Sequence, residues 1–273
     1  MFVEGIEKLL KVIFGNILIR LARINDPCWT KGAKYIYCRL EVKEGAVYPD
    51  FMSCLVDPFP IPDDWLRIFG FDKGWSDQTC LCCGALDTKN GICYIYDEYY
   101  VSEKPVTYHA RRIKELVMGH KLYKNIIADP SVRARNDRDG VSYRDYFYNV
   151  SGLWLEEGNN AIFDGIERVR DFMYQGKLKV FTNCVNLKSE AQNYLWKKDK
   201  NGISKDEPTE KNNHLMDALR YLVMALPFDI RECALTKTPD TNKMTILDRL
   251  KLHDNDSEED GEGGVYGLGY YDL

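Results

Sequence analysis

Three apolar segments follow one another between residues 66 and 100 of this 273-residue chain, with too few residues between them to form a helix. They are LRIFGF (66–71), QTCLCCGALD (78–87) and ICYIYDEYY (92–100). The second and third are joined by TKNG, whose Asn90-Gly91 pair is a strong signal for a hairpin turn. The sequence therefore predicts a meander of three strands, which needs other elements to cover its apolar faces.

Helices and short strands alternate after this meander. Apolar periodicity predicts helices over residues 105–119, 142–149, 161–175, 187–196 and from 212 to about 226, and short strands at 125–130, 152–157 and 177–181. A polar, lysine-rich stretch at 197–212 is predicted to be a mobile loop or hairpin. This order predicts a mixed α/β fold, with helices on both faces of one sheet.

The regions on either side of these elements have a different character. Residues 1–43 are predicted to form an N-terminal extension, helical over about 4–23 and irregular afterwards. Residues 44–65 contain four prolines and are predicted to be an extended connector. We therefore expect one domain over residues 66–230, followed by a C-terminal extension over 231–273.

The end of that extension dominates the net charge. Residues 254–273 hold seven acidic side chains and no lysine or arginine, so the net charge of −5 becomes +2 without them. We expect this glycine-rich tail to be disordered, acting either as a solubilising tail or as a docking peptide anchored by its tyrosines. The mild positive excess of the rest permits nucleic-acid binding without requiring it.

Hydropathy and cysteine content indicate the cellular compartment of the protein. No run of apolar residues approaches the length of about 18 that a membrane-spanning helix needs, so no membrane span is predicted. The nine cysteines are an odd number, and Cys80, Cys82 and Cys83 cluster on a predicted strand, where cysteine acts as a small apolar residue. These features predict a reduced, cytosolic protein.

Four polar side chains stand out against this apolar pattern. Asp72 ends the first predicted strand and Asp129 ends the strand at 125–130, while His214 and Asp217 lie three residues apart on the last helix. The carboxyl ends of neighbouring parallel strands meet at one edge of a sheet, where α/β folds place their sites. Several carboxylates at one place need a compensating cation, and oxygen-only ligand sets suit Mg²⁺ or Mn²⁺.

Each of these residues also has a structural interpretation. An aspartate after a strand often caps a turn or a helix, and a single histidine on a helix is usually a surface residue. Asp97, Glu98 and Glu115 are further candidate ligands. Only the ordered set of carboxylates on separate elements favours a metal site over these alternatives.

Several motifs together carry a family resemblance. In the order EGAVYPDF, FPIPDDW, GFDKGWSDQT, IYDEYY, IIADPSVR, LKSEAQNYLWKKD and NNHLMDALRY, they resemble the nuclease domain of tailed-phage terminase large subunits over about residues 44–226. The resemblance implies a ribonuclease H-like fold, a mixed central sheet flanked by helices. It also implies an endonuclease that cuts concatemeric double-stranded viral DNA during packaging.

The resemblance assigns roles to individual residues. Asp72, Asp129 and Asp217 match the family's metal-binding carboxylates, and His214 matches the histidine beside them. The implied cofactor is a pair of Mg²⁺ or Mn²⁺ ions, with Asp72 bridging both and Asp129 and Asp217 holding one ion each. His214 is the fourth catalytic residue by this resemblance, as a further metal ligand or as the group that orients one. The family often has an aspartate before the histidine, whereas this chain has Asn213, which puts a fourth carboxylate in doubt.

The stretch at 197–212 matches a hairpin beside the cleft of the family. The lysines of this stretch are expected to contact DNA phosphates. The alternative is that the hairpin is simply solvated and its lysines do not contact DNA. They are Lys197, Lys198, Lys200 and Lys205.

The resemblance also implies partners and marks one departure. Portal protein, the small terminase subunit and a separate ATPase domain are expected partners, in the cytoplasm of an infected or lysogenic bacterial host. The chain has no G-x-x-x-x-G-K-[ST] loop, so we expect a nuclease without the packaging ATPase. The alternatives are a non-catalytic assembly module and, from the D-x-G of GFDKG, an actin-like sugar kinase.

Overall fold

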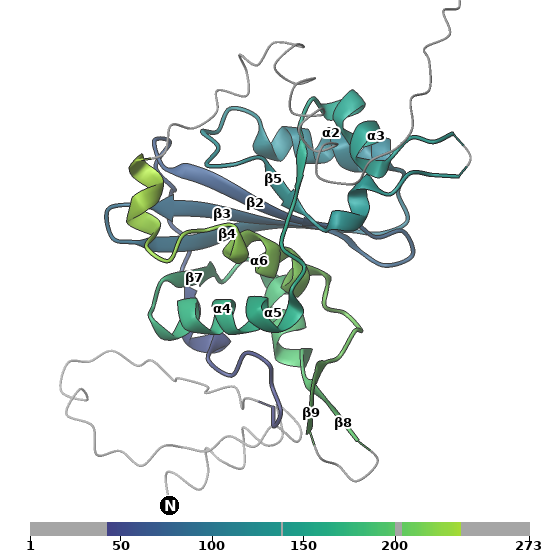
Figure 1. The fold of residues 1–273 in the computed structure, drawn as a ribbon. Coiled ribbons are helices and arrows are strands. Elements are labelled where there is room, and N and C mark those ends of the chain that lie inside the picture. The colour runs from purple at the N-terminus through teal and green to yellow at the C-terminus, as the bar shows by residue number, and fades with distance from the viewer. Residues whose placement is uncertain (1–42, 138, 200–203, 236–273) are drawn as a thin grey trace, which may run out of the picture.

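The computed structural model describes residues 43–137, 139–199 and 204–235 (Figure 1). The predicted helix over 4–23 and the acidic tail lie outside these ranges. A seven-stranded sheet crosses the described part in the order β1–β7–β4–β3–β2–β5–β6, and β8 and β9 form a separate hairpin. The strands are β1 (Leu55–Val56), β2 (Leu66–Asp72), β3 (Thr79–Asp87), β4 (Ile92–Val101), β5 (Ile126–Ala128), β6 (Leu155–Glu157), β7 (Leu178–Phe181), β8 (Trp196–Lys198) and β9 (Ser204–Pro208).

The predicted meander forms the centre of the sheet. Strand β3 pairs antiparallel with both β2 and β4, and Asp72 at the end of β2 lies opposite Cys80. The β3–β4 turn contains Gly91 at φ +72°, a left-handed conformation that glycine adopts without strain. Strand β5 extends the sheet parallel to β2, so both strands end at the same edge.

Helices cover both faces of this sheet, as the sequence predicts (Figure 1). They are α2 (Val106–Val117), α3 (Tyr143–Ser151), α4 (Ile162–Tyr174), α5 (Val185–Asn193) and α6 (His214–Met224), with 3₁₀ turns η2 (Phe51–Cys54), η3 (Pro130–Arg133) and η4 (Ile230–Leu235). Helices α2 and α3 pack on one face around Phe71, Ile113 and Phe147. Helices α4, α5 and α6 pack on the other, around Ile68 and Leu219. The alternating side chains of β2 thus serve two separate cores.

The segment 44–65 differs from the expected extended connector. It contains η2 and β1, and β1 pairs in parallel with β7 at the edge of the sheet. Val47, Phe51 and Cys54 are buried in the same core as α4, α5 and α6. This segment is therefore an integral part of the domain, because its apolar residues pack into the core on the α4–α6 face of the sheet.

Element boundaries differ from the predicted ones by a few residues. Helix α5 starts two residues earlier than expected and ends at Asn193, since Leu195 bridges to Ala46 and Trp196 starts β8. The stretch predicted as a loop or hairpin contains the hairpin β8–β9, whose tip at 200–203 is not described.

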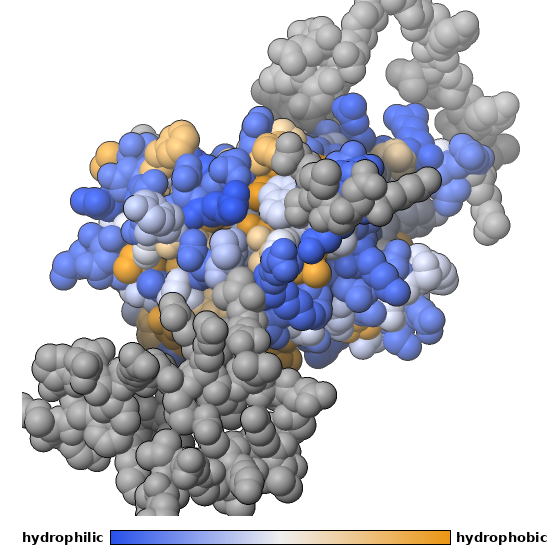
Figure 2. All heavy atoms as spheres, turned by 90° about the horizontal axis from the view of Figure 1, so that it is seen from below, coloured by the Kyte–Doolittle hydropathy of each residue, from blue (hydrophilic) through white to orange (hydrophobic). Residues whose placement is uncertain are grey.

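The face of the molecule in Figure 2 is mainly polar. Figure 2 shows hydrophilic side chains over most of the described residues in view, with apolar ones scattered among them. Among the described residues, no helix is long and apolar enough to cross a membrane.

Candidate active site

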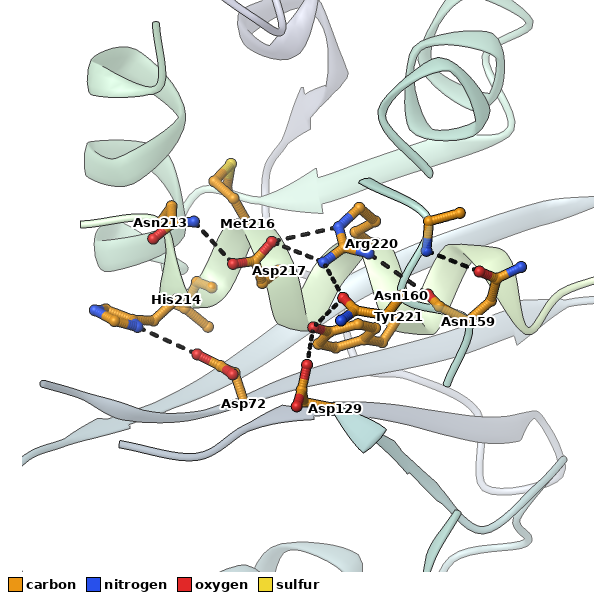
Figure 3. Close-up of polar contacts among 12 residues, drawn as sticks. Asp72, Asp129, Asn159, Asn160, Asn213, His214, Met216, Asp217, Arg220 and Tyr221 are labelled. Carbon is orange, nitrogen blue, oxygen red and sulfur yellow. Dashed lines mark hydrogen bonds and ion pairs between the residues drawn. The ribbon is translucent and has the colours of Figure 1, made fainter. Parts of the chain in front are cut away.

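Helix α6 brings two of the predicted ligands to the end of β2 (Figure 3). Its apolar side chains are buried against β2 and β3, among them Leu215, Leu219 and Leu222. His214 is the first residue of the helix and Asp217 lies one turn further on, so both lie near the edge of the sheet where β2 and β5 end. The core of the protein therefore fixes the distance between this helix and the strand ends.

Asp72 is the last residue of β2, and its carboxylate faces His214. Its Oδ2 lies 3.2 Å from Nδ1 of His214, and the two side chains are only 16% and 17% exposed. Burial raises the pKa of Asp72 to about 6. The hydrogen bond with His214 acts to lower this pKa, whereas the negative charges of Asp217 and Asp129 act to raise it. The same hydrogen bond raises the pKa of His214. Asp72 is thus a buried carboxylate beside two others, an arrangement that favours a neutralising cation.

Asp129 follows β5 and has two roles at once. Its Oδ1 accepts a hydrogen bond from the amide N–H of Ser131 at 2.7 Å, so Asp129 caps the 3₁₀ turn η3. Such a cap was the structural alternative to a metal ligand at this position. The Oδ2 of Asp129 accepts the phenol of Tyr221 at 2.6 Å. Burial alone would raise the pKa of Asp129, but these hydrogen bonds hold it below its usual value. Asp129 is therefore ionised, and the cap fixes its position.

Asp217 lies between a cation and an amide. Its Oδ1 is 3.0 Å from Nη2 of Arg220, a guanidinium that is only 2% exposed, and its Oδ2 accepts Nδ2 of Asn213 at 2.8 Å. Burial raises the pKa of Asp217, and the charge of Arg220 opposes the shift. Arg220 in turn lies 3.4 Å from the amide oxygen of Asn160.

The three aspartates line one open pocket of about 460 Å³, together with Asn160, Arg220 and Tyr221. Each carboxylate binds a different protein group. Among the described residues, no three His, Cys, Asp or Glu side chains are close enough together to hold a metal ion as they stand. His214 contacts Asp72 from outside the pocket lining. As a donor set, three carboxylates around one polar pocket suit a hard divalent cation. A carboxylate oxygen has more than one lone pair, so each aspartate can bind such an ion while it keeps its present hydrogen bonds.

The hairpin β8–β9 forms another wall of this pocket, and its lysines differ from one another. Lys197 lines the pocket, but its ammonium group lies 2.6 Å from Glu210 and 3.5 Å from Glu207. Lys198 lies 3.8 Å from Glu44 on the surface, and Lys205 is exposed. Lys200 lies outside the described residues.

The weaker candidate ligands lie elsewhere. Glu98 binds backbone amides at the start of α5, Glu115 pairs with Arg112 on α2, and neither lines the pocket. Asp97 also lies outside the lining. The sequence reasoning missed Asn160, Arg220 and Tyr221. Only the last two had a signal, because they lie three and four residues after Asp217 on one helix.

Comparison with known protein families decides the identity of this domain. A family model described as "Terminase RNAseH like domain" matches residues 69–225, more than half of the chain. The chain belongs to this terminase family. The matched region begins in β2 and ends just after α6, so it includes all four residues predicted as ligands.

Curated terminase large subunits are also similar to this chain. The terminase large subunit of Salmonella phage P22 is 33% identical over 194 residues, which cover 67% of this chain and 37% of that protein. The terminase large subunit of Escherichia phage T5 is 24% identical over 162 residues, covering 58% of this chain and 35% of that protein. The chain spans about a third of the length of these relatives.

Solved terminase structures share the fold. The large terminase of a thermophilic bacteriophage, solved in complex with ADP, superposes with a TM-score of 0.58 at 22% identity, covering 71% of this chain and 48% of that one. The nuclease domain of the P22 large terminase gives a TM-score of 0.53 at 20% identity, covering 67% and 93%. The ribonuclease H-like fold predicted from the sequence is therefore confirmed.

Proposed function

We propose that this chain is a metal-dependent endonuclease that cuts double-stranded DNA, as the nuclease part of a phage packaging terminase. The observation that carries the proposal is the pocket where Asp72, Asp129 and Asp217 meet from β2, from the end of β5 and from α6. Carboxylates from several separate elements around a polar pocket are what metal-assisted phosphodiester hydrolysis needs. Membership of the terminase family supports this chemistry and this substrate.

The three aspartates would hold two Mg²⁺ or Mn²⁺ ions. When bound, such ions lower the pKa of water and stabilise negative charge on the phosphate oxygens. The chain's own groups orient the ligands. His214 holds Asp72 and Tyr221 holds Asp129, while Arg220 balances the charge of Asp217.

Contacts to DNA would come from the hairpin. Lys198 and Lys205 are the exposed candidates beside the pocket, and Lys200 is a third by sequence. Lys197 is available only when DNA phosphates displace Glu210 and Glu207. Such contacts to the phosphate backbone carry no base-specific information, which fits an enzyme of little sequence specificity.

The wider setting follows from the family. We infer that the DNA is a viral concatemer in the cytoplasm of a bacterial host, and that the chain works with an ATPase domain, a portal protein and a small terminase subunit. Membership of the terminase family supports this setting.

A supercoiled-plasmid assay with Mg²⁺, Mn²⁺ or EDTA tests the proposal on the wild type and on Asp217→Asn. Glu167→Gln, an exposed change on α4, is the control. We expect nicked and linear products only with metal, in the wild type and the control but not in Asp217→Asn. Cutting that persists in EDTA or in Asp217→Asn would overturn the proposal. Failure of the wild type to cut with either metal would favour a non-catalytic assembly module.

A further inference from the structure

The first turn of α6 is capped by a side chain from another helix. Asn213 occupies the N-cap position but makes no side-chain cap, and its Nδ2 donates a hydrogen bond to Asp217. Glu190 on α5 takes its place. Its Oε2 accepts the amide N–H groups of Leu215 at 2.7 Å and Met216 at 3.3 Å. Glu190 is only 3% exposed, so this contact is inside the core.

The same arrangement recurs one helix earlier. The N-cap residue of α5, Cys184, makes no side-chain cap. Glu98 on β4 accepts the amide N–H groups of Asn186 at 2.7 Å and Leu187 at 2.8 Å, one on each carboxylate oxygen. It also accepts Nδ2 of Asn186 at 2.8 Å. In both helices a glutamate from a preceding element binds the amides of the second and third helical residues.

A cap of this kind does more than satisfy two backbone donors. The first amides of a helix lack intrahelical partners, and a negative charge is favoured at this end of the helix dipole. A carboxylate supplied by another element also fixes where the helix starts relative to that element. Here the capping contacts connect β4 to α5 through Glu98, and α5 to α6 through Glu190.

The cap has a direct consequence for the pocket. Because Glu190 satisfies the first turn of α6, the amide of Asn213 remains free to hold Asp217. Without Glu190, the Asn213 side chain could cap the helix through its Oδ1, since it already occupies the N-cap position. Turning toward the helix amides, it would release Asp217 and allow the start of α6 to move.

We propose that Glu190 is a positioning residue that fixes His214 and Asp217 for metal binding, and that Glu98 supports it by fixing α5. The inference rests on the proposed function, since it assigns a purpose to the geometry of those ligands. From the sequence, Glu98 was a weaker candidate metal ligand. Here it acts indirectly, because it fixes α5, and Glu190 on α5 in turn fixes α6.

The test measures Mn²⁺ binding by calorimetry and amide hydrogen exchange by NMR, both on the full chain. Glu190→Ala should weaken Mn²⁺ binding by about 10- to 100-fold, the usual effect of losing a residue that orients a metal ligand. Exchange should accelerate at Leu215 and Met216. Glu190→Gln keeps an oxygen that can accept these amides, so it should restore part of the affinity.

Two further variants distinguish an effect on the position of the metal ligands from a general loss of protein stability. Glu98→Ala should accelerate exchange at Asn186 and Leu187 and weaken Mn²⁺ binding less than Glu190→Ala does. Glu167→Gln, exposed on α4, should leave both measurements unchanged. If Glu190→Ala does not fold, Glu190→Gln decides the question, because it should still bind Mn²⁺ more weakly than Glu167→Gln.

The outcomes distinguish the inference from the function on which it rests. A folded Glu190→Ala protein with fast exchange at Leu215 and Met216 but wild-type Mn²⁺ affinity would overturn the positioning role alone. A wild type that binds no Mn²⁺ would overturn the proposed function, and the inference with it. Equal losses in Glu190→Ala and Glu167→Gln would also overturn the inference.

Discussion

Gly70 on β2 and Ala218 on α6 are in backbone contact. A Cβ atom at residue 70 would lie 1.9 Å from the carbonyl oxygen of Ala218, so only glycine allows the helix to approach the strand this closely. Asp72 lies two residues after Gly70, and Asp217 immediately precedes Ala218. The contact therefore brings two of the predicted ligands to the same pocket.

Gly70→Ala should accordingly be severely destabilising. The clash is with backbone, which cannot turn away, so we expect a loss of about 3 kcal/mol in the free energy of unfolding, the upper end of the usual range for overpacking. Gly84→Ala on the neighbouring strand is the matched control, because its Cβ would meet chiefly the Ile68 side chain at 2.9 Å. Urea unfolding compares the two. A loss in Gly70→Ala no larger than that in Gly84→Ala would contradict this account of the helix–strand contact.

Asp72 should make the stability of the metal-free protein depend on pH. Its pKa of about 6 in the folded state lies above the value near 4 of an unfolded chain, so folding favours the protonated form. This contribution is complete below pH 4 and is lost as pH rises through 6. Asp72→Asn, which stays neutral, should therefore gain stability relative to wild type between pH 4 and pH 8, by up to roughly 3 kcal/mol.

Unfolding in EDTA at several pH values measures this difference. Val185→Ala, an exposed change on α5 that removes no titratable group, should show a constant difference from wild type. Added Mn²⁺ should stabilise the wild type at pH 8 but have little effect on Asp72→Asn, because a ligand stabilises only the folded state that binds it. A pH-independent difference between Asp72→Asn and wild type would show that Asp72 is not held in an unfavourable charged state.

The sequence was sufficient to predict the central strands and to suggest that three aspartates meet, but not the contacts around them. Asp72 and Asp129 follow apolar strands and Asp217 lies in the first turn of an apolar helix, so they would meet if the two strands were neighbours, and β2 and β5 do pair. Strand β1 was missed because it has only two residues, and its pairing with β7 joins residues 125 apart in sequence.

The capping glutamates were beyond sequence reasoning for a similar reason. Glu98 binds the amide of Asn186, 88 residues away, and Glu190 binds that of Leu215, 25 residues away. No local spacing connects these positions. The ion pairs of Lys197 with Glu207 and Glu210 likewise depend on how the hairpin closes, which is why this lysine looked like a free DNA contact.

Tyr221→Phe should loosen Asp129 without changing the shape of the core. The variant loses the 2.6 Å hydrogen bond from the phenol, so the pKa of Asp129 should rise toward its usual value. We expect Mn²⁺ affinity to fall by about tenfold, as when other groups that orient a metal ligand are removed. NMR titration of Asp129 and calorimetry measure the two effects.

The control for this variant is Tyr174→Phe, a tyrosine on α4 that is 85% exposed. It should change neither quantity. If Tyr221→Phe left both the pKa of Asp129 and the Mn²⁺ affinity unchanged, Tyr221 would serve only to fill space under the pocket.

The hairpin lysines should contribute unequally to DNA binding. Lys198→Ala and Lys205→Ala should each lower the salt dependence of binding by about 0.9 in the slope of log K against log salt, as one lost phosphate contact does. Lys197→Ala should have a smaller effect, because Glu210 and Glu207 already neutralise its charge. Binding of duplex DNA by Asp217→Asn protein in EDTA gives these slopes without cleavage.

Lys89→Ala, in the exposed β3–β4 turn at the opposite end of the meander, is the control for these lysines. It should leave the slope unchanged. Equal slopes in all four lysine variants and in the parent would place the DNA away from the hairpin.

The most direct measurement is anomalous diffraction from a crystal of the protein soaked in MnCl₂, collected near the manganese absorption edge. The account predicts anomalous density in the pocket between Asp72, Asp129 and Asp217, with Asp129 still bound to Tyr221 and Asp217 still bound to Arg220. The density should be absent from an Asp217→Asn crystal treated in the same way. A pocket without density in the wild type, or density bound only at other residues, would contradict the central claim that these three aspartates form a metal site.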